Sequence, residues 1–128
     1  MRWVSLEAIL VIHEAQLEWF GGAGGIRDIG LIKSALARAP NKAAYENASL
    51  DRLAAAYLYG FAKNHGFVDG NKRVAFLSAD TFLRINGYEI HAEQAEIIAL
   101  VLSAAAGEVN EDFIARWIAK HRRAASRA

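Results

Sequence analysis

His65-Gly-Phe-Val-Asp-Gly-Asn-Lys-Arg73 is the stretch of sequence that organises this chain, because it separates two helical patterns. Before it, apolar residues recur at the i, i+3, i+4 and i+7 positions of a buried helical stripe, which stops at Asn64. A second stripe begins at Val74 and stops at Asn86-Gly87, a usual end for a helix. The stretch is therefore predicted to fill a tight loop and the first turn of the second helix.

The start of that second helix is predicted to bind phosphate. The first amides of a helix lack partners within the helix and lie at the positive end of its dipole, so they attract anions. Glycine at position 70 lets an anion approach the backbone closely. The next cations add charge, and an arginine can hold two phosphate oxygens through its planar guanidinium. The predicted phosphate-binding residues are Gly70, Asn71, Lys72 and Arg73.

Asp69 and His65 add an acid and a base to the same loop. A carboxylate at position 69 would repel phosphate, and Mg²⁺ resolves this conflict because it is commonly held by one or two carboxylates together with nucleotide phosphates. Asp69 is therefore predicted to bind Mg²⁺. His65 is the only nearby side chain that takes up a proton near neutral pH. Taken singly, each residue is explained by a turn, a cap or solvated surface, but their combination favours a functional site.

Six helices are predicted along the chain. In order, they run from the Ser5 cap to the glycine loop 21–25, from the Asp28 cap to Pro40, from Ser49 to Asn64, from Asn71 to Asn86, from Glu93 to Ala106, and from Asn110 onwards. Residues 88–90 alternate as in a strand, but three residues alone are too few to make a sheet. The predicted fold class is all-α, a compact single-domain bundle of about six helices over residues 1–128.

Composition bounds the function. The 15 Lys and Arg residues are nearly balanced by 14 Asp and Glu residues, so no direct DNA binding is expected. No uncharged stretch approaches the ~18 residues of a membrane span, and no signal pattern is found at the N-terminus, so a soluble protein without a membrane partner is expected. The absence of cysteine fits a cytoplasmic location. The basic tail from Lys120 to Arg127 is expected to be solvated and frayed.

Other residues outside the loop invite simpler interpretations. His13 lies on the apolar stripe of the first helix, which favours a core or interface histidine over a metal ligand. Trp3, Trp19 and Trp117 are expected to pack in the core or at its rim. The glycine loop 21–25 lacks the Gly-Lys-Ser/Thr ending of a Walker loop. Two roles remain open for that loop, as a flexible connection or as a border of the functional site.

With its neighbours, the 65–73 stretch resembles the Fic/Doc family, whose signature is His-x-Phe-x-(Asp/Glu)-Gly-Asn-(Gly/Lys)-Arg. Every fixed position is present. Most Fic enzymes have glycine at the position of Lys72, and the lysine makes this chain resemble the Doc (death-on-curing) branch. The stretch from Gly21 to Leu36 and Ile85-Asn-Gly-Tyr88 also resemble Doc-like proteins. One departure is Gly66, where the family usually has proline. Because glycine has more conformational freedom, the loop is expected to be looser there.

The resemblance implies a toxin of a toxin–antitoxin pair. In this role His65 would be the catalytic base, Phe67 the buried anchor of the loop, and Asp69 the Mg²⁺ ligand. The enzyme would transfer the γ-phosphate of ATP to a target hydroxyl, by resemblance a threonine of elongation factor Tu, and so inhibit translation. A Phd-type antitoxin would be the controlling partner. The alternatives are AMP transfer to a protein hydroxyl, as in Fic enzymes, and a non-catalytic binding module.

Control from outside the chain is also expected. Many Fic enzymes inhibit themselves with a Ser/Thr-x-x-x-Glu-Gly/Asn helix, and this chain has no match, since Ser103 is followed four residues later by Gly107 and then Glu108. A disordered partner segment that folds into a helix on an exposed apolar groove would supply the missing control.

Overall fold

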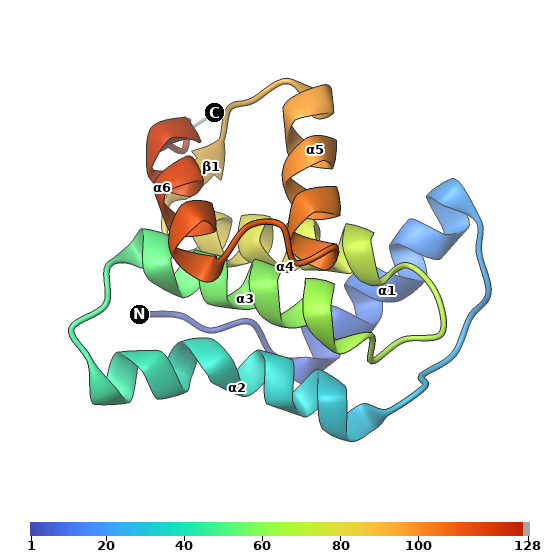
Figure 1. Cartoon of the computed structure of the whole chain (residues 1–128). Helices are drawn as coiled ribbons and strands as arrows, with labels where there is room; N and C mark the ends of the chain where they lie inside the picture. The colour runs from blue at the N-terminus through green and yellow to red at the C-terminus, as the bar shows by residue number, and fades with distance from the viewer. Residues whose placement is uncertain (127–128) are drawn as a thin grey trace.

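The computed structural model describes residues 1–126, and within them the fold is mostly helical, as predicted (Figure 1). The elements are α1 (Leu6–Phe20), α2 (Ile29–Tyr45), α3 (Leu50–Asn64), α4 (Asn71–Ile85), β1 (Tyr88–Ile90), α5 (Gln94–Ala105), α6 (Glu111–His121) and β2 (Arg122–Ala124). None of these helices is long and apolar enough to cross a membrane.

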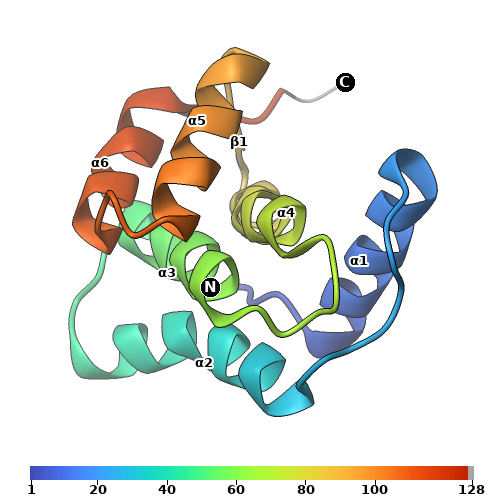
Figure 2. The same cartoon turned by 45° about the vertical axis from the view of Figure 1, so that its right-hand side comes forward.

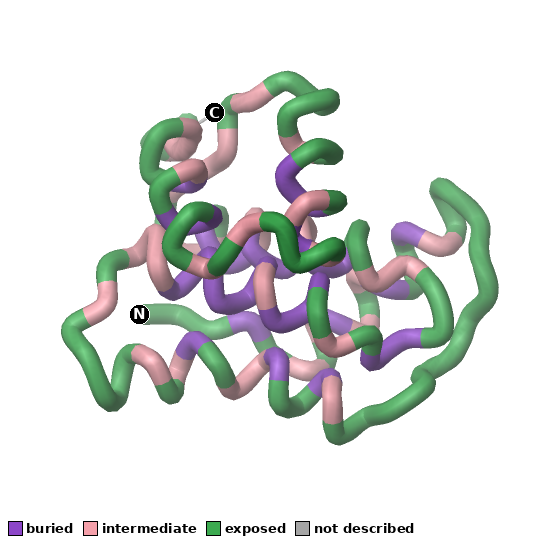
Figure 3. Tube along the Cα trace, in the orientation of Figure 1, coloured by how far each residue is buried: buried purple, intermediate pink, exposed green. Residues whose placement is uncertain are grey.

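Helix α3 forms the centre of the molecule. All of its residues from Leu53 to Ala62 except Tyr59 are buried, which explains the run of small alanines that lets other helices approach closely. Helix α2 lies along one side of α3, α4 along another, and α6 crosses it (Figures 1 and 2). The buried residues accordingly concentrate along α3 and the facing sides of its neighbours (Figure 3). The loop 65–70 leaves α3 and enters α4, so it is fixed at the end of the core.

The predicted helix starts are confirmed by their caps. The Ser5 side chain accepts a hydrogen bond from Ala8 N, and the Ser49 side chain accepts one from Arg52 N. Asp28 accepts from two amides of the first turn of α2, and Asn110 does the same for one amide of α6. Each cap satisfies an amide that the helix itself leaves without a partner.

Pro40 does not stop the second helix, contrary to the prediction. Helix α2 continues to Tyr45 with Pro40 inside it. A proline within a helix costs about 3 kcal/mol, because it removes one backbone hydrogen bond and crowds the preceding turn. Before the proline, Ala35 and Ala39 are fully buried in the core, and beyond it the Lys42 ammonium binds both Glu46 and Glu111. The buried alanines and the contact with Glu111 are tertiary, and they hold α2 together against the local preference of proline.

Residues 88–90 do form a strand, and the prediction of a frayed tail is wrong up to Ala125, whose amide donates to Gly87 O. Strand β1 pairs antiparallel with β2, which comes from the tail. Arg122 on β2 forms a salt bridge with Asp51 and lies over the Tyr88 ring, 4.5 Å from its centroid. The alternation of three residues gave no sign of a partner strand more than 30 residues away. Arg127 lies outside the described residues.

The three tryptophans differ in burial. Trp3 stacks on Phe82 with ring centroids 5.8 Å apart, and the half-buried Trp117 stacks on His121. Trp19 is 83% exposed, so its expected place in the core or rim is wrong. It lies in the last turn of α1, which extends beyond the rest of the bundle (Figure 2).

Candidate functional site

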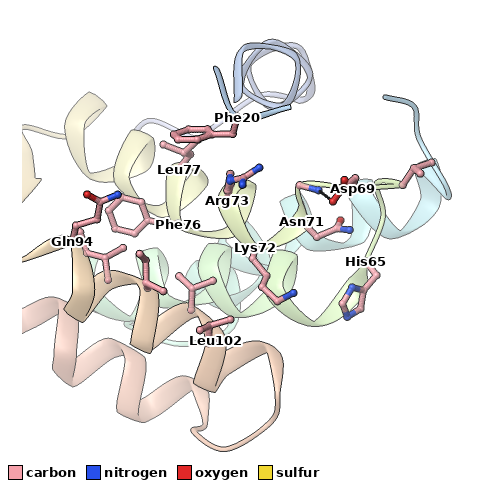
Figure 4. Close-up of a pocket in the computed structure, with 15 residues that line it drawn as sticks. Phe20, His65, Asp69, Asn71, Lys72, Arg73, Phe76, Leu77, Gln94 and Leu102 are labelled. Carbon is pink, nitrogen blue, oxygen red and sulfur yellow. Dashed lines mark hydrogen bonds between the residues drawn. The ribbon is translucent and has the colours of Figure 1, made fainter. Parts of the chain in front are cut away.

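The 65–73 stretch lines a cavity of about 770 Å³ between α1, α4 and α5. One side of the cavity is polar and is formed by the loop and the first turn of α4 (Figure 4). The other side is apolar and is formed by α4, α5 and the end of α1; its residues include Phe20, Phe76, Leu77, Ile97, Ile98, Val101 and Leu102. The cavity therefore joins a charged helix start to a hydrophobic groove.

His65 caps the C-terminal end of α3 in the left-handed conformation, with φ of 51°. Outside glycine this conformation costs roughly 1 to 2 kcal/mol, so its presence calls for contacts that hold it. Arg27 supplies one such contact, since its Nε donates to the His65 carbonyl at 2.8 Å. The imidazole is exposed and lines the cavity, where it can reach a bound molecule.

Phe67 and Asn71 fix the shape of the loop. Phe67 is only 1% exposed, and its ring stacks on that of His13 with centroids 3.8 Å apart. The Asn71 side chain closes a ring with the backbone of Phe67: Oδ1 accepts from Phe67 N and Nδ2 donates to Phe67 O, both at 2.9 Å. Because both polar atoms of its side chain are used in this way, Asn71 can bind an anion only through its backbone amide.

His13 is a core histidine, as predicted. It is 6% exposed, and its Nε2 lies 2.8 Å from the carbonyl oxygen of Asp69. A carbonyl oxygen only accepts hydrogen bonds, so Nε2 carries the proton in this contact. Helix α1 thereby holds the loop at Phe67 and at Asp69.

The Asp69 carboxylate is exposed and already accepts two backbone hydrogen bonds. Gly70 N donates to Oδ1 at 2.8 Å, and Ala23 N donates to Oδ2 at 3.3 Å. In residues 1–126 no three His, Cys, Asp or Glu side chains come together as metal ligands. A single carboxylate suits Mg²⁺ held mainly by water and by the phosphates of a nucleotide, and it does not suit a metal site built from protein alone.

The two glycines of the 65–73 stretch both lie where an added side chain would meet close neighbours. Gly70 has φ of 83°, and a Cβ there would lie 2.1 Å from Nε2 of Gln16. A Cβ on Gly66 would lie 2.6 Å from Cγ1 of Ile32. The Gly66 carbonyl also accepts hydrogen bonds from the amides of residues 27 and 28. In the structure Gly66 packs closely against α2, and the looser loop expected there stays a prediction.

Lys72 and Arg73 project from the first turn of α4 in different directions. Lys72 is exposed, and its side chain runs between His65 and Leu102 at the edge of the cavity (Figure 4). Arg73 instead reaches α1, where its Nη1 donates to Gln16 Oε1 at 3.3 Å and its guanidinium lies 4.6 Å from the Phe20 ring centroid. No side chain in residues 1–126 caps the start of α4, so its first amides remain open to a ligand.

The glycine loop borders the site rather than merely connecting two helices. Gly25 O accepts a hydrogen bond from Val68 N at 3.1 Å, and Ile26 forms an isolated bridge with Phe67. A Cβ on Gly22 would lie 2.7 Å from the Asp69 carboxylate. The loop therefore follows the 65–70 segment closely, including the residue that carries the acid.

Gln16 and Phe20 of α1, together with the apolar face of α5, are site residues that sequence reasoning missed. Gln16 lies three residues after His13 on the side of α1 that also buries Ile9, and this spacing was the available signal. Ile98 and Leu102 on α5 are 50% and 51% exposed. Their position against α4 depends on helix packing, which local sequence does not specify.

Comparison with known proteins agrees with this geometry. Residues 3–83 match the Fic/DOC family, and the chain belongs to it. Over 116 residues, covering 90% of this chain and 91% of the relative, it is 35% identical to "Protein kinase doc" of Escherichia phage P1. Over 77 residues, 58% of each chain, it is 47% identical to "Toxin Doc" of Mycolicibacterium smegmatis.

Proposed function

We propose that this chain is the toxin of a toxin–antitoxin pair and transfers the γ-phosphate of ATP to a hydroxyl of a target protein. The main support is that one cavity is lined by the base His65, the acid Asp69, the cations Lys72 and Arg73, and the uncapped start of α4. The names of the two relatives, a protein kinase and a toxin, support the same activity. By resemblance, the target is a threonine of elongation factor Tu, and its modification would inhibit translation in the cytoplasm.

In the proposed reaction His65 takes the proton of the target hydroxyl. The hydroxyl oxygen forms a bond to the γ-phosphorus of ATP, the bond from that phosphorus to the bridging oxygen breaks, and ADP leaves. The proton then passes from His65 to solvent. The amides of the first turn of α4 and the Arg73 guanidinium hold the phosphates, and the packed Phe67 keeps the loop in place.

Asp69 is the residue proposed to hold Mg²⁺. When bound with ATP, the ion would reduce the negative charge of the phosphates that the hydroxyl must approach. Each oxygen of the Asp69 carboxylate accepts one backbone hydrogen bond, so further lone pairs remain for the ion. ATP binding measured by calorimetry should therefore be tighter with Mg²⁺ than without it, and equal affinities would remove Asp69 from this role.

Lys72 favours phosphate transfer over AMP transfer. Its long cationic side chain occupies the edge of the phosphate site, where glycine would leave an opening. ATP is then expected to bind reversed, with its γ-phosphorus in line with the attacking hydroxyl, and either orientation places only one phosphorus in that line. AMP transfer remains the second candidate, because the same loop and helix start serve both reactions.

The apolar side of the cavity is the proposed docking place of a Phd-type antitoxin. Ile98, Leu102 and Phe20 are large, exposed and adjoin the phosphate site. An amphipathic helix laid on these residues would cover the cavity and block access of ATP or target. An antitoxin gene immediately beside the gene for this chain would support the assignment.

The test is to incubate the protein with a bacterial lysate, Mg²⁺ and ATP labelled at either the γ- or the α-phosphate. Label that reaches a protein from the γ-position alone supports phosphate transfer. Label from the α-position would replace it with AMP transfer. No label from either position, in a lysate that a known protein kinase can label, would favour a non-catalytic binding module.

A further inference from the structure

One face of α1 contacts the 65–73 stretch through three side chains. His13, Gln16 and Phe20 are three and four residues apart, so they lie on the same side of the helix. His13 binds the Asp69 carbonyl, while Gln16 and Phe20 both contact Arg73. Arg73 belongs to the first turn of α4, and it crosses to α1 although its own side chain is exposed.

Gln16 is fixed in place by its surroundings. It is 2% exposed, and its amide fills the space that a Cβ on residue 70 would occupy. Its Oε1 accepts the hydrogen bond from Arg73, whereas its Nε2 is buried and has no hydrogen-bond partner within residues 1–126. A buried polar atom without a partner is unfavourable, which indicates that this amide is kept for the contact made by its oxygen.

Phe20 holds the same guanidinium from a second direction. The Arg73 guanidinium carbon lies 4.6 Å from the centre of the Phe20 ring, within the range of a cation–π interaction. The ring is 63% exposed, so core packing does not explain its position. Figure 4 shows Phe20 above Arg73 at the edge of the cavity, with Lys72 pointing away from both.

We propose that Gln16 and Phe20 are positioning residues that hold Arg73 in its anion-binding orientation before the ligand arrives. The proposal rests on the proposed function in taking the anion to be a phosphate of ATP. A free arginine side chain loses rotamer freedom when it binds, and a side chain that is already ordered loses less. The hydrogen bond uses one of five N–H donors of the guanidinium, so the others remain available to phosphate oxygens.

Nucleotide binding tests the first consequence. Phe20→Leu should weaken binding of ATP with Mg²⁺ about 2- to 5-fold, the usual weight of an exposed cation–π contact. Gln16→Met, which keeps the length but removes the acceptor, should weaken it about 3- to 10-fold. Phe20→Trp should keep the parent's affinity, because tryptophan is the better cation–π partner. Val11→Ala, an exposed change elsewhere on α1, is the matched control and should leave the affinity unchanged.

A double-mutant cycle separates positioning of Arg73 from a general structural effect. In an Arg73→Gln background, Gln16→Met and Phe20→Leu should have no further effect on ATP affinity, because the side chain they position is gone. Melting temperatures identify any variant that fails to fold, and Phe20→Leu is the safer variant because its side chain is exposed. Undiminished effects of both changes in the Arg73→Gln background would overturn the proposal.

A second measurement on the free protein does not depend on ATP. The ¹⁵N relaxation of the Arg73 Nε–H group should show an ordered side chain in the parent and a mobile one in Gln16→Met and Phe20→Leu. An Arg73 side chain equally mobile in all three proteins would overturn the proposal, whatever the protein binds. If the parent does not bind ATP but Arg73 shows this loss of order, the positioning stands and the proposed function fails.

Discussion

The loop between α3 and α4 is held in shape by hydrogen bonds of its own residues and of Asn71 at the start of α4. Asn71 closes on the backbone of Phe67, and the Asp69 carboxylate accepts the amide of the next residue. The His65 imidazole remains exposed in the cavity, with its backbone held by Arg27. A rigid loop that leaves a titratable ring exposed is a suitable arrangement for a general base.

Replacement of His65 tests its chemical role. His65→Ala should slow transfer roughly 10²- to 10⁴-fold, because a hydroxyl is a weak nucleophile until its proton is removed. The initial rate of label transfer from ATP measures the effect. ATP affinity should be largely kept, since the phosphate contacts come from α4. A variant that transfers phosphate as fast as the parent would exclude His65 as the base.

Replacement of Gly66 tests the packing of the loop against α2. Gly66→Ala should lower the free energy of unfolding by about 1 to 3 kcal/mol, because the added methyl group overlaps Ile32. Gly24→Ala is the matched control: its Cβ would meet a Leu17 methyl at 3.9 Å, so little change is expected. Urea denaturation compares the two. Equal stability of both variants would mean that the loop moves to accept a side chain.

At the scale of elements, sequence was sufficient where the signal is local. Ser5, Ser49 and Asn110 cap the predicted helices, and the stretch that ends at Asn64 leads into the predicted loop. Prediction from sequence failed where the structure of a segment depends on residues far away in the chain. Contacts of α2 with the core allow that helix to continue through Pro40, and the C-terminal tail supplies the partner strand of β1. The site shows the same division, since loop residues were named but the contacts from α1 and α5 were not.

The pairing of β2 with the body of the protein can be tested at Arg122. Its side chain binds Asp51 on α3 and covers the Tyr88 ring, and the hydrogen bond with Asp51 raises the pKa of Arg122. Arg122→Ala should lower the free energy of unfolding by about 1 to 2 kcal/mol and increase amide exchange in β1. Arg123→Ala, on the exposed neighbouring residue, should have a smaller effect. Unchanged exchange in β1 would contradict the pairing.

The whole molecule is organised around a core that contains one buried phenol. Tyr57 is fully buried, and its hydroxyl accepts a hydrogen bond from Val4 N, which ties the N-terminal segment to α3. Burial raises the pKa of Tyr57 above its ordinary value of 10.0, although the bond from Val4 acts in the opposite direction.

This shift predicts how stability depends on alkaline pH. Because the folded state keeps the Tyr57 proton more tightly than the unfolded state, its contribution is fully present below pH 10 and is lost as pH rises through the raised pKa. Tyr57→Phe should cost about 1 kcal/mol at neutral pH by removing the acceptor for Val4 N. The difference in free energy of unfolding between parent and variant should shrink above pH 10. A constant difference across that range would contradict the assignment.

The proposed function is that this chain moves a phosphate from ATP to a protein hydroxyl. Mass spectrometry of purified elongation factor Tu, incubated with the protein, ATP and Mg²⁺, tests this transfer and its target together. We expect a mass increase of one phosphate on a single threonine, and none with His65→Ala. A mass increase of one AMP would contradict the proposed transfer of phosphate. If elongation factor Tu stays unmodified while another protein of a bacterial lysate is phosphorylated, the proposed target is wrong.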